Sequence, residues 1–191
     1  MAYSGLMVRT GRLSLLPACE DDRYFFENLW SDPAVCQGFG LAGPRPPEEV
    51  RLHLTEAERH WQRHGFGLFS IFVRNSGEWA GFCELEVLQN PPAGLNLPQP
   101  VVELAFAVLM RHWQKRYATE AARAMLRFGF ETAGIPLIFG ATGENNLASQ
   151  RVMRLAGLRS IAERPFYPPC PHFWLRREEY LPVGDEYACF R

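Results

Sequence analysis

The sequence lacks the features that tie a chain to a membrane or to nucleic acid. No apolar run is long enough to span a bilayer, and the N-terminus shows no signal-peptide pattern. The formal net charge of the 191 residues is −1, so the overall charge predicts no nucleic-acid partner. We therefore expect neither a membrane nor a nucleic acid among the partners of this protein.

The sequence also lacks the spacings of metal and disulfide sites. Its five cysteines are scattered, odd in number and without CxxC spacing, which favours a reducing compartment and a cytoplasmic location. His60 and His64 stand four residues apart on an expected helix, but no third ligand accompanies them. We expect no metal ion.

Residues 101–134 are expected to form a strand, a turn and a helix in succession. Residues 101–109 are almost wholly apolar and follow several prolines, which is typical of a buried strand. Residues 118–131 form a strongly helical run, and Gly134 and Pro136 predict its end. Small side chains recur on one face of this helix and predict close packing against a sheet: Ala118, Ala122, Met125, Gly129 and Ala133.

The turn before this helix has the character of an anion site. The first turn of a helix carries unpaired backbone N–H groups and the positive end of the helix dipole. Lys115 and Arg116 add positive charge at the same place. We expect a phosphorylated ligand here, and the alternative for such a basic turn is a solvated surface loop.

The remaining patterns predict an α+β fold in a single domain over residues 1–191. Before the central stretch we expect a strand over 6–16, a helix opening at 20–22 and closed by 31–33, a loop over 38–47, a helix from 46 to 65, and strands over 66–73 and 79–87 joined at 75–77. After it we expect a strand over 137–141, a helix capped by Asn145 or Asn146 and ended by Gly157, and strands over 158–164 and 172–177.

Two apolar stripes define the faces of the first two helices. The first consists of Tyr24, Phe25, Leu29 and Trp30, and the second of Val50, Leu54, Ala57 and Trp61. The strands at 101–109 and 137–141 are expected to pair in parallel, because a helix connects them.

Three motifs follow one another in a recognisable order. They are residues 103–106 (ELAF), residues 113–121 (WQKRYATEA), and residues 146–149 (NLAS) followed by Gly157. In this order they resemble the GNAT superfamily of acetyl-CoA-dependent N-acetyltransferases, in particular its RimJ/RimL-like branch. The resemblance covers nearly the whole chain. It implies a GNAT-like domain with a mixed central sheet, one splayed parallel strand pair and flanking helices.

The resemblance implies acetyl-CoA as cosubstrate and assigns residues to it. The pantetheine arm would bind the main chain of Phe106, Ala107 and Val108 and the side chain of Asn146. The pyrophosphate would bind the backbone amides of Gln114, Lys115, Arg116, Tyr117, Ala118 and Thr119. The family usually has glycine where Gln114 and Arg116 stand here. If either position needs a positive φ, its side chain adds about 1–3 kcal/mol of strain.

The implied reaction is direct attack of an amine on the thioester, which needs a base and a proton donor. Glu103, alone in an apolar strand, is the preferred base, acting through water; the alternative is a strand-end carboxylate paired with an arginine. Glu84 is the reserve base. Many family members donate the proton from a tyrosine at the position of Met153, so Ser149 is the substitute candidate, and the alternative is a serine bonded to its own backbone.

Three functions are compatible with these residues. The first is an N-acetyltransferase acting on a protein N-terminus or a small amine. The second is an acetyl-CoA-binding regulatory module without turnover, which Arg116 and Met153 favour. The third is a structural domain that binds no cofactor. The loops at 38–47, 89–100 and 165–171 are expected to shape the acceptor pocket. The oligomeric state is open, with a homodimer as one option.

Overall fold

The computed structural model describes residues 5–89, 97–161, 170–184 and 186–190. Its strands form one sheet in the order β7-β8-β6-β5-β4-β3-β2-β1-β9. Their bounds are β1 Met7–Thr10, β2 Leu13–Pro17, β3 Leu68–Val73, β4 Trp79–Val87, β5 Val101–Val108, β6 Leu137–Ala141, β7 Arg159–Ile161, β8 His172–Arg176 and β9 Tyr187–Phe190. Neighbours are antiparallel except β5 and β6, which pair in parallel as predicted.

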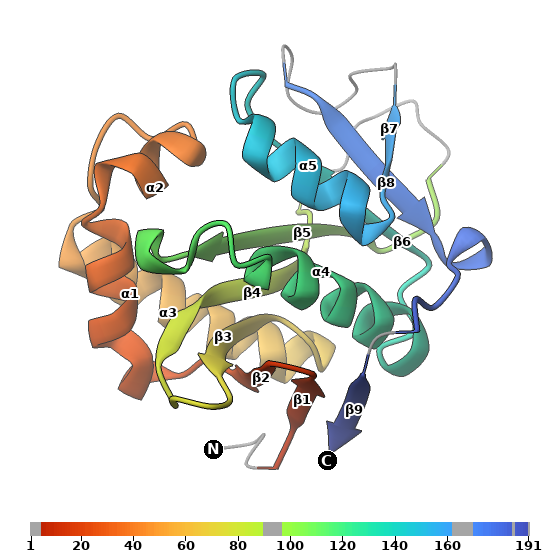
Figure 1. Ribbon diagram of the computed structural model, residues 1–191, viewed down its shortest axis with the longest axis horizontal. Helices are drawn as coiled ribbons and strands as arrows, with labels where there is room; N and C mark the ends of the chain where they lie inside the picture. The colour runs from red at the N-terminus through yellow and green to blue at the C-terminus, as the bar shows by residue number, and fades with distance from the viewer. Residues whose placement is uncertain (1–4, 90–96, 162–169, 185, 191) are drawn as a thin grey trace.

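Helices cover both faces of the sheet (Figure 1). Helices α4 (Tyr117–Arg127) and α5 (Leu147–Ala156) lie on one face. Helices α1 (Arg23–Trp30) and α3 (Pro47–His64) lie on the other, and the short α2 (Pro33–Gly38) follows α1. The α+β class and the mixed sheet predicted from the sequence are confirmed.

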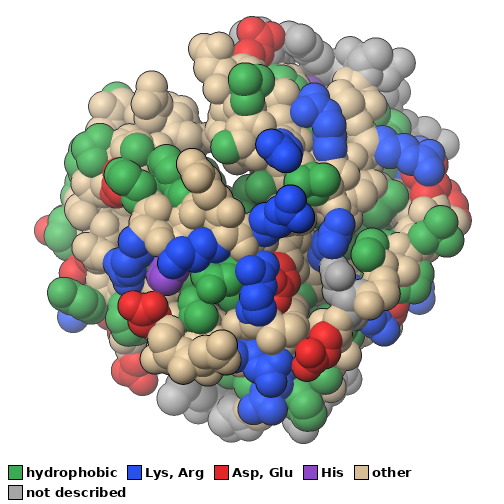
Figure 2. Space-filling view, viewed as in Figure 1, with side chains coloured by type: hydrophobic (Ala, Val, Ile, Leu, Met, Phe, Trp, Pro, Cys, Tyr) green, Lys and Arg blue, Asp and Glu red, His purple; other side chains and the backbone are tan. Residues whose placement is uncertain are grey.

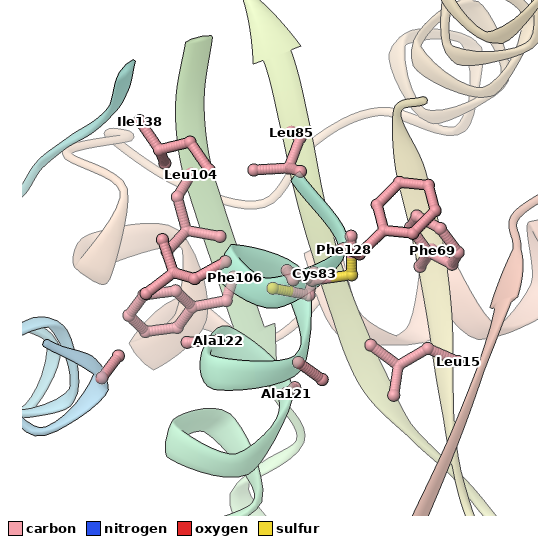
Figure 3. Packing of buried hydrophobic residues seen from close by; sticks show 14 of the residues in the cluster. Leu15, Phe69, Cys83, Leu85, Leu104, Phe106, Ala121, Ala122, Phe128 and Ile138 are labelled. Carbon is pink, nitrogen blue, oxygen red and sulfur yellow. The ribbon is translucent and has the colours of Figure 1, made fainter. Parts of the chain in front are cut away.

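The core beneath α4 is built from alternate residues of neighbouring strands. Phe69, Cys83 and Phe106 are partners along the sheet and share one buried cluster with Ala121 and Ala122 of α4 (Figure 3). The ring of Phe69 packs edge-on against Phe128, just after α4. Gly129 shows how close the approach is: a Cβ atom there would lie 2.7 Å from Cδ1 of Ile138. The prediction of a narrow helix face is therefore confirmed.

The central helix ends in a different geometry from the one expected. After Arg127 the chain continues as a π-helical turn over Phe128–Thr132, and Gly134 follows with a φ of 71°. The helix α3 and the hairpin between β3 and β4 follow the prediction, and Gly65 ends α3 with a φ of 74°.

Three predictions near the N-terminus are corrected. The strand expected over 6–16 is a hairpin of β1 and β2, because the chain turns at 11–12. The stripe of α1 includes Phe26, which is buried, whereas Tyr24 is 75% exposed. Residues 31–33 also begin a further helix, α2, whose first turn Asp32 caps by accepting a hydrogen bond from Ala34 N at 2.9 Å.

At the other end of the chain, β9 was not predicted, and it pairs with β1 at the edge of the sheet. Of the strand expected over 158–164, the structure describes β7, and residues 162–164 lie outside the described residues. Most of the loops at 89–100 and 165–171 also lie outside them. No helix in the described ranges is long and apolar enough to cross a membrane.

Candidate active site

The parallel strands β5 and β6 separate partway along their length. Their pairing ends at Glu103 and Phe139. β5 continues to Val108 and, within the described part of the chain, pairs only with β4 over these last residues. A strand without a neighbour leaves N–H and C=O groups unpaired, so this edge of β5 can bind an extended ligand.

The predicted pantetheine-binding residues lie along this edge. Phe106 and Ala107 are 9% and 8% exposed, so their main chain borders the separation without lying on the open surface. The carbonyl of Val108 is already used, because it accepts a hydrogen bond from Nε1 of Trp113 at 2.8 Å. That bond ties the end of β5 to the turn that follows it.

The turn before α4 adopts a strained backbone at two positions. Gln114 and Arg116 have φ values of 62° and 63°, in the left-handed region that favours glycine. Such conformations cost about 1–3 kcal/mol each and persist only where the surroundings impose them. The chain therefore keeps a glycine-type turn without glycine at either position.

The backbone of this turn presents donors at the start of a helix. Among the described residues, no acceptor takes the N–H groups of 114–119, and the first helical bond runs from Glu120 N to Arg116 O at 3.0 Å. These donors add to the positive end of the α4 dipole, which favours an anion. The structure thus brings together the six residues predicted to hold a pyrophosphate.

Glu120 fixes the start of α4 to the turn between β1 and β2. Its carboxylate accepts hydrogen bonds from Thr10 Oγ1 at 2.6 Å, Arg12 N at 2.9 Å and Arg12 Nε at 2.7 Å. Arg12 also donates to the carbonyl of Lys115 at 3.0 Å, and its guanidinium lies over the ring of Tyr117. These contacts, which the sequence did not reveal, hold the strained turn in place.

Positive side chains gather over this region (Figure 2). Lys115 and Arg116 are exposed beside the donors of the turn. A groove of about 330 Å³ is lined by Arg116, Arg123 and Arg127, and its acidic lining residues are Glu120 and Glu186. The surface next to the turn therefore suits a ligand that carries several negative charges.

Asn146 joins the two sides of the site. Its Oδ1 accepts a hydrogen bond from Ser149 N at 3.1 Å and caps α5, as predicted. Its Nδ2 donates to the carbonyl of Gly38 in α2, also at 3.1 Å. A pantetheine bond to this side chain, which the resemblance implies, therefore competes with the contact to Gly38.

Ser149 lies in the first turn of α5 and keeps a free hydroxyl. Its N–H is bonded to Asn146, but its Oγ forms no hydrogen bond within the described residues. The alternative of a hydroxyl bonded to its own helix is therefore not observed. Met153, where the family often has tyrosine, is 2% exposed and packs near Gly140, and its thioether carries no proton to donate.

Three carboxylates lie together on the face of the sheet that α3 covers, opposite the face that carries α4 and α5. Glu84 and Glu86 are two residues apart on β4 and so share a face, and Glu103 of β5 is the direct partner of Glu86. Glu84 is 6% exposed, and its Oε2 lies 3.5 Å from Nε2 of His53 on α3. Both candidate bases therefore belong to one group of acids.

Burial, together with the negative charges of Glu86 and Glu84, raises the pKa of Glu103 to about 7. A hydrogen bond from the backbone N–H of Ala141 opposes this rise in the pKa. Burial followed by the charge of Glu84 also raises the pKa of Glu86. No arginine pairs with Glu103 among the described residues, so the alternative of a strand-end ion pair is not observed. A carboxylate with a pKa near neutral is suited to act as a general base.

His53 is the residue of this region that the sequence reasoning missed. It stands between Val50 and Leu54 of the apolar stripe of α3, at the border of the buried face. A histidine at the edge of such a stripe was the available signal. Its partner on β4 could not be identified without the packing of α3 on the sheet.

Comparisons with known proteins agree with this geometry. Residues 12–159 match the family model described as an acetyltransferase (GNAT) domain. The FsC-acetyl coenzyme A-N(2)-transacetylase of Aspergillus fumigatus is 29% identical over 155 residues, which cover 81% of this chain and 65% of that protein. The match thus spans slightly less than two thirds of that relative's length.

Solved structures share the fold. The acetyltransferase from Agrobacterium tumefaciens str. C58 superposes with a TM-score of 0.76 at 22% identity, covering 89% of this chain and 94% of that one. RimL, a ribosomal L7/L12 alpha-N-protein acetyltransferase in complex with coenzyme A, gives 0.71 at 17% identity, covering 89% and 97%. At these identities the likeness concerns the fold alone.

The splayed strand pair, the donor-rich turn and the family match over residues 12–159 lead to one conclusion. This chain belongs to the GNAT acetyltransferase family.

Proposed function

We propose that this protein transfers the acetyl group of acetyl-CoA to a primary amine, either a protein N-terminus or a small amine, by direct attack on the thioester. The observation that carries this proposal is that, among the described residues, β5 has no strand partner beyond Glu103 on the side of β6, and the turn that follows it has N–H groups without an acceptor at the start of α4. An extended thioester with a pyrophosphate at its far end has the chemistry to use both.

The donor-binding residues are those that line this path. The amides of 114–119 hold the pyrophosphate, with Lys115 and Arg116 adding charge from the surface. The main chain of Phe106 and Ala107 holds the pantetheine arm beside the gap in the sheet. Asn146 is placed to contact the same arm after releasing Gly38.

Glu103 is the proposed base. It takes a proton from the acceptor ammonium through water, which frees the amine lone pair to attack the carbonyl carbon of the thioester. As the carbon–nitrogen bond forms and the carbon–sulfur bond breaks, the sulfur leaves as a thiolate. The nitrogen then gives up its second proton as the amide forms. The hydroxyl of Ser149 is the candidate donor of a proton to the sulfur, and it regains a proton from the nitrogen through water. Glu84 is the reserve base.

A thiol-release assay tests the proposal. Purified protein with acetyl-CoA is offered a panel of small amines and N-terminal peptides, and free thiol is measured with and without each amine. Amine-dependent release supports the transferase. The same panel compares peptides with small amines, and so tests the likeness to the RimJ/RimL-like branch, whose acceptors include protein N-termini.

A non-catalytic acetyl-CoA-binding module is the second candidate. The strained side chains at 114 and 116 and the methionine at 153 favour it. A thermal-shift titration separates the candidates further, because a ligand at one hundred times its Kd stabilises the fold by about 2.7 kcal/mol. Stabilisation without thiol release would identify the binding module, and no shift at millimolar acetyl-CoA would exclude both candidates.

A further inference from the structure

The acidic group formed by Glu84, Glu86 and Glu103 has one basic neighbour in contact with it. Within the described residues, the imidazole of His53 is the only basic side chain within ion-pair distance of any of the three. Its Nε2 lies 3.5 Å from Glu84, and the ring packs edge-on against Phe26 of α1. The contact becomes an ion pair when the imidazole carries a proton.

The second histidine near this group cannot supply a charge in the same way. Nε2 of His60 accepts a hydrogen bond from Val87 N at 3.0 Å, so it carries no proton, and Nδ1 lies 2.9 Å from the carbonyl of Phe66. Both ring nitrogens are thus engaged in the neutral form, and burial lowers the pKa of His60. His53 differs, because Nδ1 has no hydrogen-bond partner and Nε2 faces a carboxylate.

The charge of His53 reaches the proposed base through its neighbours. A cation at His53 lowers the pKa of Glu86, against the opposing effects of Glu84 and of Glu56 on α3. Glu86 is in turn the sheet partner of Glu103. Because neighbouring carboxylates titrate as a group, removing the nearby cation raises the pH at which the last of their protons leaves.

We propose that His53 is a positioning residue of the acetyltransferase: paired with Glu84, it balances the charge of the Glu84–Glu86–Glu103 group and keeps Glu103 able to take the proton of the acceptor amine near neutral pH. This inference rests on the proposed function, since Glu103 is the base of that reaction. His53 does not touch the reacting atoms and acts only through the carboxylates.

The test compares His53→Gln with His53→Lys and with His64→Gln as a matched control. His64 lies on the same helix, where its ring packs against His60 and Phe66 instead of the acids. In His53→Gln we expect the acidic limb of kcat/KM for the amine to move up by about 0.5–1 pH unit. An opposite charge beside a carboxylate shifts its pKa by about 1–3 units, and the effect on Glu103 is smaller because His53 reaches it only through Glu84 and Glu86. The KM for acetyl-CoA should not change. His53→Lys should restore the limb, and His64→Gln should leave it in place.

A second readout does not require turnover. Protein labelled with carbon-13 at the glutamate side-chain carboxyl is titrated by NMR, with Glu103→Gln identifying the resonance. If His53 acts as proposed, the highest titration midpoint of the three carboxyls rises in His53→Gln and returns toward the wild-type value in His53→Lys. An unchanged midpoint would overturn the inference, even if wild-type turnover is normal. Absence of thiol release with a shifted midpoint would instead count against the proposed function alone.

Discussion

The proposed active site has a donor side, for acetyl-CoA, and an acceptor side, for the amine, and the two sides are built by opposite means. The donor side is a backbone structure on the surface, in which a strained turn and the start of α4 present N–H groups beside exposed positive charge. The acceptor side is made of side chains, with acids from β4 and β5 beneath a histidine from α3. The donor side therefore depends on chain conformation, and the acceptor side on protonation.

Because of this difference, variants on the donor side and variants on the acceptor side should affect different measured quantities. Changes at the turn should alter the affinity for acetyl-CoA, whereas changes at the carboxylates should alter turnover and its pH dependence. A variant that moves both quantities together would show that the two sides are not independent.

The largest effect is expected at the proposed base. Glu103→Gln keeps the shape of the side chain but removes the proton acceptor, so turnover should fall by roughly 10²–10⁴-fold, the usual contribution of a general base. The Kd for acetyl-CoA, measured by isothermal titration calorimetry, should stay the same. Turnover that matches the wild type across a pH series would remove Glu103 from the mechanism.

The next largest effect is expected at Glu120, whose hydrogen bonds hold the turn before α4 in place. Glu120→Ala leaves Thr10 and Arg12 without their acceptor, which should lower the free energy of unfolding by about 1–3 kcal/mol. The turn loses its anchor, so the Kd for acetyl-CoA should rise by about 10-fold, equivalent to 1.4 kcal/mol.

Glu131→Ala is the control for Glu120→Ala. It breaks an exposed ion pair with Arg127 at the end of the same helical segment, and such pairs contribute at most about 1 kcal/mol. Urea unfolding and calorimetry measure both variants. Equal losses of affinity in the two would contradict the proposed role of Glu120.

A further comparison tests the pH dependence of the acceptor side through stability. The pKa of Glu103 is about 7 in the folded protein against 4.5 for the ordinary side chain. The folded state holds the proton of Glu103 more tightly than the unfolded state does. The resulting contribution to the free energy of unfolding is therefore fully present below pH 4.5 and is lost as the pH rises through 7. Glu103→Gln removes this pH-dependent loss of stability. On going from pH 5 to pH 8, the free energy of unfolding of the variant should therefore increase by about 1–3 kcal/mol relative to that of the wild type.

Urea unfolding at the two pH values measures this gain, with Glu178→Gln as the control at an exposed site. A difference between variant and wild type that is the same at pH 5 and pH 8 would show that Glu103 titrates in the folded state as it does in water.

The smallest effect is expected at the strained turn itself. Arg116→Gly relieves a left-handed side-chain conformation and should leave the Kd for acetyl-CoA unchanged or lower, with a stability gain of about 1 kcal/mol. Arg116→Ala keeps the strain and removes only the charge. If both variants lose affinity strongly, the guanidinium itself grips a phosphate, and the backbone is not the main contact.

Sequence reasoning reached the donor side more completely than the acceptor side. The turn is contiguous in the chain, so its helix start, its basic residues and the two positions of positive φ follow from one short motif and its resemblance. The hydrogen bonds that Glu120 accepts were missed because their donors, Thr10 and Arg12, lie more than one hundred residues away in the chain. No local pattern reports such a contact.

The acceptor side shows the same limit. Glu103 and Glu84 were recognisable as single acids within apolar strands, but their grouping with Glu86 depends on the register between β4 and β5. The pairing of Glu84 with His53 depends on how α3 lies across the sheet. The missed helix α2 had a readable signal, since Asp32 before Pro33 is a typical helix start.

The central claim is that the amides of residues 114–119 hold the pyrophosphate of acetyl-CoA, and amide NMR tests it most directly. On titration of nitrogen-15-labelled protein with acetyl-CoA, the amide resonances of the turn and the first turn of α4 should show the largest shifts in the spectrum. Saturable binding that leaves these resonances in place while others move would contradict the claim.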